Sequence, residues 1–206
     1  AYYDESCDSR PLFEDLKIAN EPSFETHLNK YPVIKLDIPT VLSVMNKIDT
    51  FEVAFNQCIL KDIYIYYPTL EKKNFTSISQ AIFYLYEQNK KQFVFIIDEW
   101  DALFREYPKD IENQKVYINI LRILFKSSMS SSIALCYMTG ILPIKKYNTE
   151  SALNNFDEYT MLDPATMAPY IGFTQEEVKP LCEKYSMDFN DIKAWYDGYE
   201  FKRVGS

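Results

Sequence analysis

At 206 residues, the chain is long enough for one main domain with a small appendage. Hydrophobic residues make up 47% and aromatic residues 16%, which excludes a disordered polar chain and predicts a globular protein with a filled core. The formal net charge is −8, whereas nucleic acid and anionic membranes attract basic surfaces. We therefore expect no membrane partner and no nucleic-acid partner for this chain.

Cysteine and histidine usage argues against two further classes of site. The single histidine is His27, and the cysteines Cys7, Cys58, Cys136 and Cys182 form no C-x-x-C pair. A zinc site or a disulfide framework therefore has no support, and free thiols in a reducing compartment are expected. The sequence also shows no run of about 18 apolar residues and no charged leader, so we expect a cytoplasmic protein.

Strand-like and helix-like segments alternate through the first two thirds of the chain. Strands are predicted at 33–38, 93–98 and 131–140, and helices at 50–67, 75–89 and 113–128. The second and third strands are apolar at consecutive positions, which is typical of strands buried on both faces. This order predicts an α/β fold in which a parallel sheet carries helices on both faces.

The segment after Gly140 is polar, and it predicts a loop with one strand at 159–162. Two helices are expected beyond it. One begins at a T-x-x-E capping box, Thr174 to Glu177, and the other begins at Asn190 and ends near Gly198.

The change in pattern divides the chain into an α/β core at 1–165 and a small helical, lid-like subdomain at 166–206. In the second part, Trp195 and Tyr196 suit either core anchors or a platform on which bases stack.

Polar residues end all three predicted strands. Asp37, the pair Asp98 and Glu99, and Thr139 should meet at the carboxyl edge of the sheet, where ligands bind in parallel α/β folds. For Asp37 a turn role before Pro39 is favoured, because acids commonly serve such turns.

An apolar strand that ends in Asp-Glu is a pattern typical of nucleotide-hydrolysing proteins. The Asp at the strand end can hold Mg²⁺ through water, and the next Glu can polarise the water that attacks a γ-phosphate. The alternative is that Asp98 and Glu99 are the first solvated residues after a strand. Asp101 could support the site from behind or cap the helix or loop that follows.

The sequence resembles the AAA-ATPase-like proteins, whose full-length members often carry a PD-(D/E)XK-type nuclease domain downstream. The matching stretches, in chain order, are YYDESCDSRPLF, HLNKYPVIKLDI, VFIIDEWDALF, MTGILPIKKY, SALNNFDEYTML, GFTQEEVK and WYDGYEF. Trp100 departs from the Tyr expected after the two acids, a change that leaves Asp98 and Glu99 in place.

The resemblance implies a bacterial protein with a P-loop NTPase fold that uses ATP and Mg²⁺. It assigns metal and cofactor binding to Asp98 and the catalytic water-orienting role to Glu99. It also assigns Thr139 to γ-phosphate sensing, although a threonine that caps a loop explains this position equally well.

The sequence has no glycine before Gly140, whereas phosphate-cradling loops need glycine for close backbone approach. Taken with the resemblance, this predicts that the chain starts after the first strand and the Walker A loop of such an ATPase. Alone it should be inactive and should not bind ATP. The absent strand should also leave the 131–140 strand unpaired, which favours self-association.

The resulting hypothesis is a fragment of an ATPase that acts as a conformational switch on an attached nuclease or a partner. The alternative is a non-catalytic interaction or regulatory module on an ATPase scaffold. A nuclease within this chain ranks last, because Lys35 and Asp37 stand in the wrong arrangement for D/E-x-K.

Overall fold

The computed structural model describes residues 1–48, 50–143 and 153–196. By contacts it divides into two compact units, Ala1–Phe156 and Asp157–Ser206. This division falls earlier in the chain than the 165/166 boundary expected from the sequence.

Three parallel strands form the sheet of the first unit. They are β1 (Val33–Asp37), β2 (Phe93–Asp98) and β3 (Ile133–Met138), in the order β1-β2-β3. In register, Asp37 lies opposite Asp98, and Ile97 lies opposite Met138. The carboxyl ends of all three strands therefore lie at one edge of the sheet.

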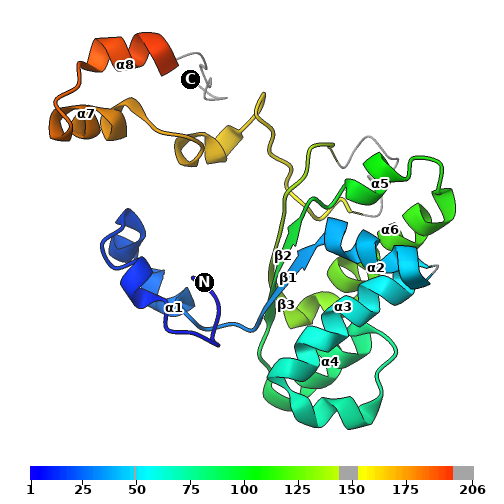
Figure 1. Cartoon of the computed structure of the whole chain (residues 1–206). Helices are drawn as coiled ribbons and strands as arrows, with labels where there is room; N and C mark the ends of the chain where they lie inside the picture. The colour runs from blue at the N-terminus through cyan, green and yellow to red at the C-terminus, as the bar shows by residue number, and fades with distance from the viewer. Residues whose placement is uncertain (49, 144–152, 197–206) are drawn as a thin grey trace. The chain divides into compact units, whose positions relative to one another are not determined.

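Helices connect the strands, as the sequence predicts. Between β1 and β2 lie α2 (Ile38–Ile48), α3 (Phe51–Tyr66), η3 (Pro68–Lys73) and α4 (Ile78–Asn89). Between β2 and β3 lie α5 (Ala102–Glu106), α6 (Ile111–Lys126) and η4 (Ser128–Ser132). The predicted α/β class, a parallel sheet flanked by helices, is confirmed, and α2, α3, α4 and α6 lie on one side of the sheet (Figure 1).

Helix α2 is an element that the sequence pattern did not predict. The carboxylate of Asp37 accepts hydrogen bonds from the Thr40 backbone N–H at 3.0 Å and from its hydroxyl at 2.5 Å. Pro39 stands in the first turn, where a missing N–H costs nothing. Together these residues start a helix directly after β1, where the sequence had suggested only a turn.

The core lies between the sheet and these helices. Its largest buried side chains include Phe51, Phe55, Phe95, Ile97 and Tyr117. Phe95 of β2 packs edge to face on Phe125 of α6, with ring centroids 5.3 Å apart. Each such buried ring contributes about 1.5–3 kcal/mol through removal of apolar surface from water.

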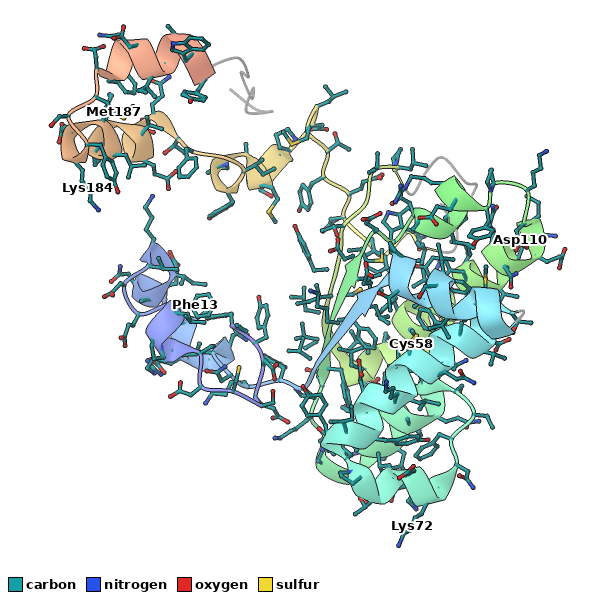
Figure 2. All side chains as sticks on the ribbon, in the orientation of Figure 1. Phe13, Cys58, Lys72, Asp110, Lys184 and Met187 are labelled. Atoms are coloured by element: carbon teal, nitrogen blue, oxygen red, sulfur yellow. The ribbon has the colours of Figure 1, made fainter. Side chains whose placement is uncertain are left out.

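Polar side chains fix where the core helices begin. Asp110, labelled in Figure 2, accepts a hydrogen bond from the Asn113 backbone N–H at 3.2 Å and so caps α6. Asn113 in turn accepts from the Phe51 N–H at 3.1 Å, at the start of α3. Asn56 of α3 accepts from the Ile78 N–H at 2.8 Å, at the start of α4. These bonds connect α3 to both α6 and α4.

Strand β3 differs from the prediction of burial on both faces. Leu135 and Tyr137 of β3 pair in register with Val94 and Ile96 of β2, so they share one face of the sheet. Leu135 is 39% exposed and Tyr137 is 57% exposed. Among the described residues, β3 also has a strand partner on its β2 side alone. Its apolar run therefore marks a face and an edge that the described residues leave open.

The N-terminal segment consists of short helical turns before the sheet: η1 (Arg10–Leu12), η2 (Lys17–Asn20) and α1 (Phe24–His27). Asn29 has a left-handed backbone conformation, with φ 54°, and its side chain bonds to two parts of this segment. The Asn29 side chain accepts from the Ser9 N–H and donates to the Asp4 carbonyl at 2.7 Å. Arg10 forms a two-bond ion pair with Glu25.

The second unit contains η6 (Ala165–Tyr170), α7 (Gln175–Lys184) and α8 (Phe189–Tyr196). The predicted capping box is confirmed. The Thr174 hydroxyl accepts from the Glu177 backbone N–H, and the Glu177 side chain accepts from the Thr174 backbone N–H. Figure 2 labels Met187 in the link between α7 and α8.

Three expectations for this unit are wrong. Residues 159–162 form no strand. Asp188, not Asn190, accepts the backbone N–H groups at the start of α8. Trp195 and Tyr196 are 84% and 80% exposed, so they are not core anchors. The predicted helix end at Gly198 lies outside the described residues.

In the part of the chain that the structure describes, no helix combines the length and the apolar character needed to cross a bilayer.

Candidate functional site

The candidate site lies at the carboxyl edge of the sheet, where β2 and β3 end. The Thr139 hydroxyl donates a hydrogen bond to Asp98 Oδ1 at 2.5 Å, and the Glu99 backbone N–H donates to the same oxygen at 3.1 Å. The two candidate cofactor-binding side chains, Asp98 and Thr139, are thus brought together from separate strands. Asp98 is exposed at this edge.

Backbone hydrogen bonds hold the two strand ends in place. The Thr139 N–H donates to the Ile97 carbonyl, and the Trp100 N–H donates to the Thr139 carbonyl, both at 2.9 Å. Asp37 lies next to Asp98 in register, but its carboxylate is engaged with Thr40 as the cap of α2. Asp37 therefore has a local structural role, as the cap of α2, in place of the turn before Pro39 that the sequence favoured.

Glu99 occupies a left-handed backbone conformation with φ 48°. This region is uncommon for residues other than glycine and often marks functional sites. The Glu99 carboxylate accepts a hydrogen bond from Arg105 Nη2 at 2.5 Å, and its side chain is 47% exposed. This bond to Glu99 is the main reason that the pKa of Arg105 lies above its ordinary value.

Asp101, two residues after Glu99 in the chain, is fully buried. Its two carboxylate oxygens accept from the Ile141 N–H at 3.2 Å, the Leu142 N–H at 2.9 Å and Arg105 Nε at 3.0 Å. A buried carboxylate is tolerated only with such partners. Asp101 therefore supports the site by fixing the loop after β3, and its side chain does not cap α5.

Gly140 allows the two loops to meet. A Cβ atom at this position would lie 2.5 Å from Trp100 Cδ1 and 2.7 Å from Asp101 Oδ1, closer than side chains can approach. The first glycine of the sequence is therefore required by packing between the β2 and β3 loops.

The oxygen chemistry of the site fits Mg²⁺. Mg²⁺ is usually held by one or two carboxylates together with water and substrate phosphates. Within the described ranges, no three His, Cys, Asp or Glu side chains gather to form a metal cage. A single exposed carboxylate beside a hydroxyl, Asp98 beside Thr139, suits a cation that arrives with phosphate. Such an ion would neutralise charge on the phosphate oxygens.

Arg105 is the site residue that the sequence pattern missed. Its i,i+4 spacing from Asp101 is a signal for an ion pair on a helix. Its contact with Glu99 depends on the turn at Glu99. Glu99 and Arg105 are not spaced as neighbours on one helix face, so the sequence pattern could not predict this contact.

A three-stranded parallel sheet flanked by helices is consistent with a P-loop NTPase-like fold. Residues 1–149 match the family model described as "Predicted AAA-ATPase", AAA-ATPase_like, and the chain belongs to this family. This membership supports an ATPase-like function. No curated protein and no solved structure matches the chain.

Proposed function

We propose that this chain supplies the metal and water end of a Mg·ATP site in an ATPase that works as a conformational switch. The observation that carries the proposal is the hydrogen bond between Thr139 and Asp98, which gathers polar groups from two strands beside Glu99. In this proposal Asp98 holds Mg²⁺ through water, Glu99 orients the attacking water, and Thr139 contacts the γ-phosphate.

The phosphate-binding part of the site lies outside these 206 residues in this proposal. The support is compositional, because no glycine precedes Gly140 and a phosphate loop is built from glycine-rich backbone. In the longer protein, hydrolysis would change the conformation of this domain and thereby control an attached nuclease domain or another partner.

The test compares Glu99→Gln with Asp98→Ala in the longer protein that carries a phosphate loop. Glutamine keeps the size of Glu99 and removes its charge, so nucleotide binding should persist while turnover falls on the order of 10²–10⁴-fold. Loss of Asp98 should weaken Mg²⁺-dependent nucleotide binding as well as turnover. The measurements are nucleotide affinity with and without Mg²⁺ and steady-state hydrolysis.

Glu106→Gln is the matched control, since Glu106 is an exposed acid at the end of α5 with no assigned role. It should leave both quantities unchanged. If both site variants hydrolyse ATP like wild type, or if wild type neither binds nor hydrolyses ATP, the catalytic proposal fails.

A second candidate function is a non-catalytic interaction module on the ATPase scaffold. It is favoured by the exposed apolar side chains of β3, Leu135 and Tyr137, which a partner could cover. This candidate predicts that substitutions at Asp98 and Glu99 shift stability slightly and leave partner binding intact.

A further inference from the structure

The guanidinium of Arg105 bridges two carboxylates of unequal burial. Nη2 donates to Glu99 Oε2 at 2.5 Å, and Nε donates to Asp101 Oδ2 at 3.0 Å. The Arg105 side chain is 26% exposed, Glu99 is 47% exposed and Asp101 is 0% exposed. One guanidinium therefore carries an outer bond, to Glu99, and an inner bond, to Asp101.

The inner bond is the more persistent of the two. Asp101 is shielded from water and also accepts the Ile141 and Leu142 N–H groups, so removal of Arg105 would leave a buried carboxylate undercompensated. The outer bond is screened by solvent, and ion pairs of this kind are weak. When the arrangement opens, the bond to Glu99 should break first while Arg105 stays attached to Asp101.

The backbone of Glu99 is fixed on both sides, so its side chain is the part that can change partner. Its N–H donates to Asp98 Oδ1, and the next N–H, of Trp100, donates to the Thr139 carbonyl. The Glu99 carboxylate can thus be held by Arg105 or released to solvent without moving Asp98 or Thr139.

We propose that Arg105 is a positioning residue that restrains Glu99: the outer bond occupies the Glu99 carboxylate, which can orient water only after this bond opens. The inference rests on the proposed function of Glu99. It adds a restraint within the chain, with Asp101 as its fixed anchor. While Glu99 Oε2 accepts from Arg105, that oxygen is not available to accept from an attacking water, so the restraint lowers the basal rate.

The first experiment observes the bonds on this chain and needs no nucleotide. In NMR spectra of the arginine side chains, rotation about the Cζ–Nη bond and exchange of Nε–H report the outer and inner bonds separately. Wild type should show hindered Nη rotation and a protected Nε–H at Arg105. Glu99→Gln should release the rotation and leave Nε–H protected.

Arg10 provides the control within the same spectra, because its ion pair with Glu25 lies in the N-terminal segment. Its signals should be unchanged by Glu99→Gln, and Glu25→Gln should affect Arg10 and leave Arg105 unchanged. If Arg105 rotates freely in wild type, or if Glu99→Gln changes nothing at Arg105, the inference is overturned.

The second experiment measures the restraint in the longer protein. Arg105→Met should raise kcat for ATP hydrolysis about three- to fivefold, the equivalent of one weak exposed ion pair, with KM changed less than about twofold. Adding Glu99→Gln should abolish the gain. Structural damage would lower kcat, so an increase that depends on Glu99 separates restraint from misfolding.

A kcat that falls or stays constant in Arg105→Met, at an unchanged urea unfolding midpoint, overturns the inference while the proposed function stands. Where the midpoint is lower, Asp101→Asn is compared with Asp101→Asn plus Arg105→Met, because the buried charge is absent from both, and the same outcomes decide. If wild type shows no hydrolysis, the proposed function fails. Restraint of a catalytic Glu99 then fails with it, and the NMR experiment separately shows whether the Arg105 contact itself exists.

Discussion

At the scale of single residues, Tyr117 has a feature that lowers the stability of the fold. Its ring lies in the core against Phe51, with centroids 4.8 Å apart, yet its buried hydroxyl has no hydrogen-bond partner among the described residues. Burial also raises the pKa of Tyr117 well above its ordinary value. An unpaired buried hydroxyl costs about 1–3 kcal/mol.

We therefore expect Tyr117→Phe to stabilise the fold by about 1 kcal/mol, because it removes the unpaired hydroxyl and keeps the ring. Tyr2→Phe is the control. The Tyr2 hydroxyl donates to the Phe24 carbonyl at 3.0 Å, so its removal should destabilise by about 0.5–1.5 kcal/mol. Urea unfolding midpoints at unchanged slope measure both. A lower midpoint for Tyr117→Phe would show that the hydroxyl has a partner such as buried water.

The residues of the site differ in how far sequence alone could identify them. Asp98 and Glu99 were predictable because they follow an apolar strand directly, and Thr139 because it ends the next strand. A supporting role for Asp101 is one of the roles that the sequence allows, but its bonds to Ile141 and Leu142 depend on how two distant loops meet. Such contacts across about 40 positions leave no local pattern, so tertiary structure was needed to find them.

At the scale of elements, the apolar patterns predicted where helices and strands lie in the chain better than how deeply they are buried. Helices α3 and α4 and strand β2 lie where their apolar patterns place them. Helix α2 was missed because a proline at its start reads as a turn, and the burial of β3 was overestimated. A run of apolar residues shows that a strand is suited to burial on both faces. It does not show which segment covers each face.

The open edge of β3 should lead to pairing with a second copy of the chain. Within residues 1–48, 50–143 and 153–196, no strand pairs with the outer edge of β3, and this edge beside exposed Leu135 and Tyr137 forms a surface suited to strand addition. We expect wild type to form dimers or larger species as concentration rises, and Tyr137→Lys to shift the population toward monomer by adding charge beside the edge. Sedimentation velocity over a concentration series measures this.

Tyr66→Lys is the matched control, because Tyr66 is 60% exposed on helix α3, close to the 57% of Tyr137. This variant should associate like wild type. Strict monomers in wild type at every concentration, or the same behaviour in both variants, would contradict pairing through β3.

At the scale of the whole molecule, each unit shows a different balance of core and surface. The first unit holds a continuous core from β1 to η4. In the second unit, α8 has no buried residue and Cys182 is the buried side chain of α7. The helices of this small subdomain were predicted, but the exposure of Trp195 and Tyr196 was not. An amphipathic pattern identifies a helix without showing what the helix packs against.

The last prediction concerns nucleotide binding by the chain of 206 residues itself. Its carboxyl edge gathers Asp98 and Thr139, but acidic and hydroxyl groups alone do not attract a triphosphate. Phosphate affinity in this class comes from a glycine-rich backbone cradle and its lysine, and the chain has no glycine before Gly140. Calorimetry with Mg·ATP should therefore show no saturable heat for this chain. Saturable 1:1 binding of micromolar affinity by this chain would mean that another part of it holds the phosphates, and the assignment of the phosphate loop to a segment outside it would be wrong.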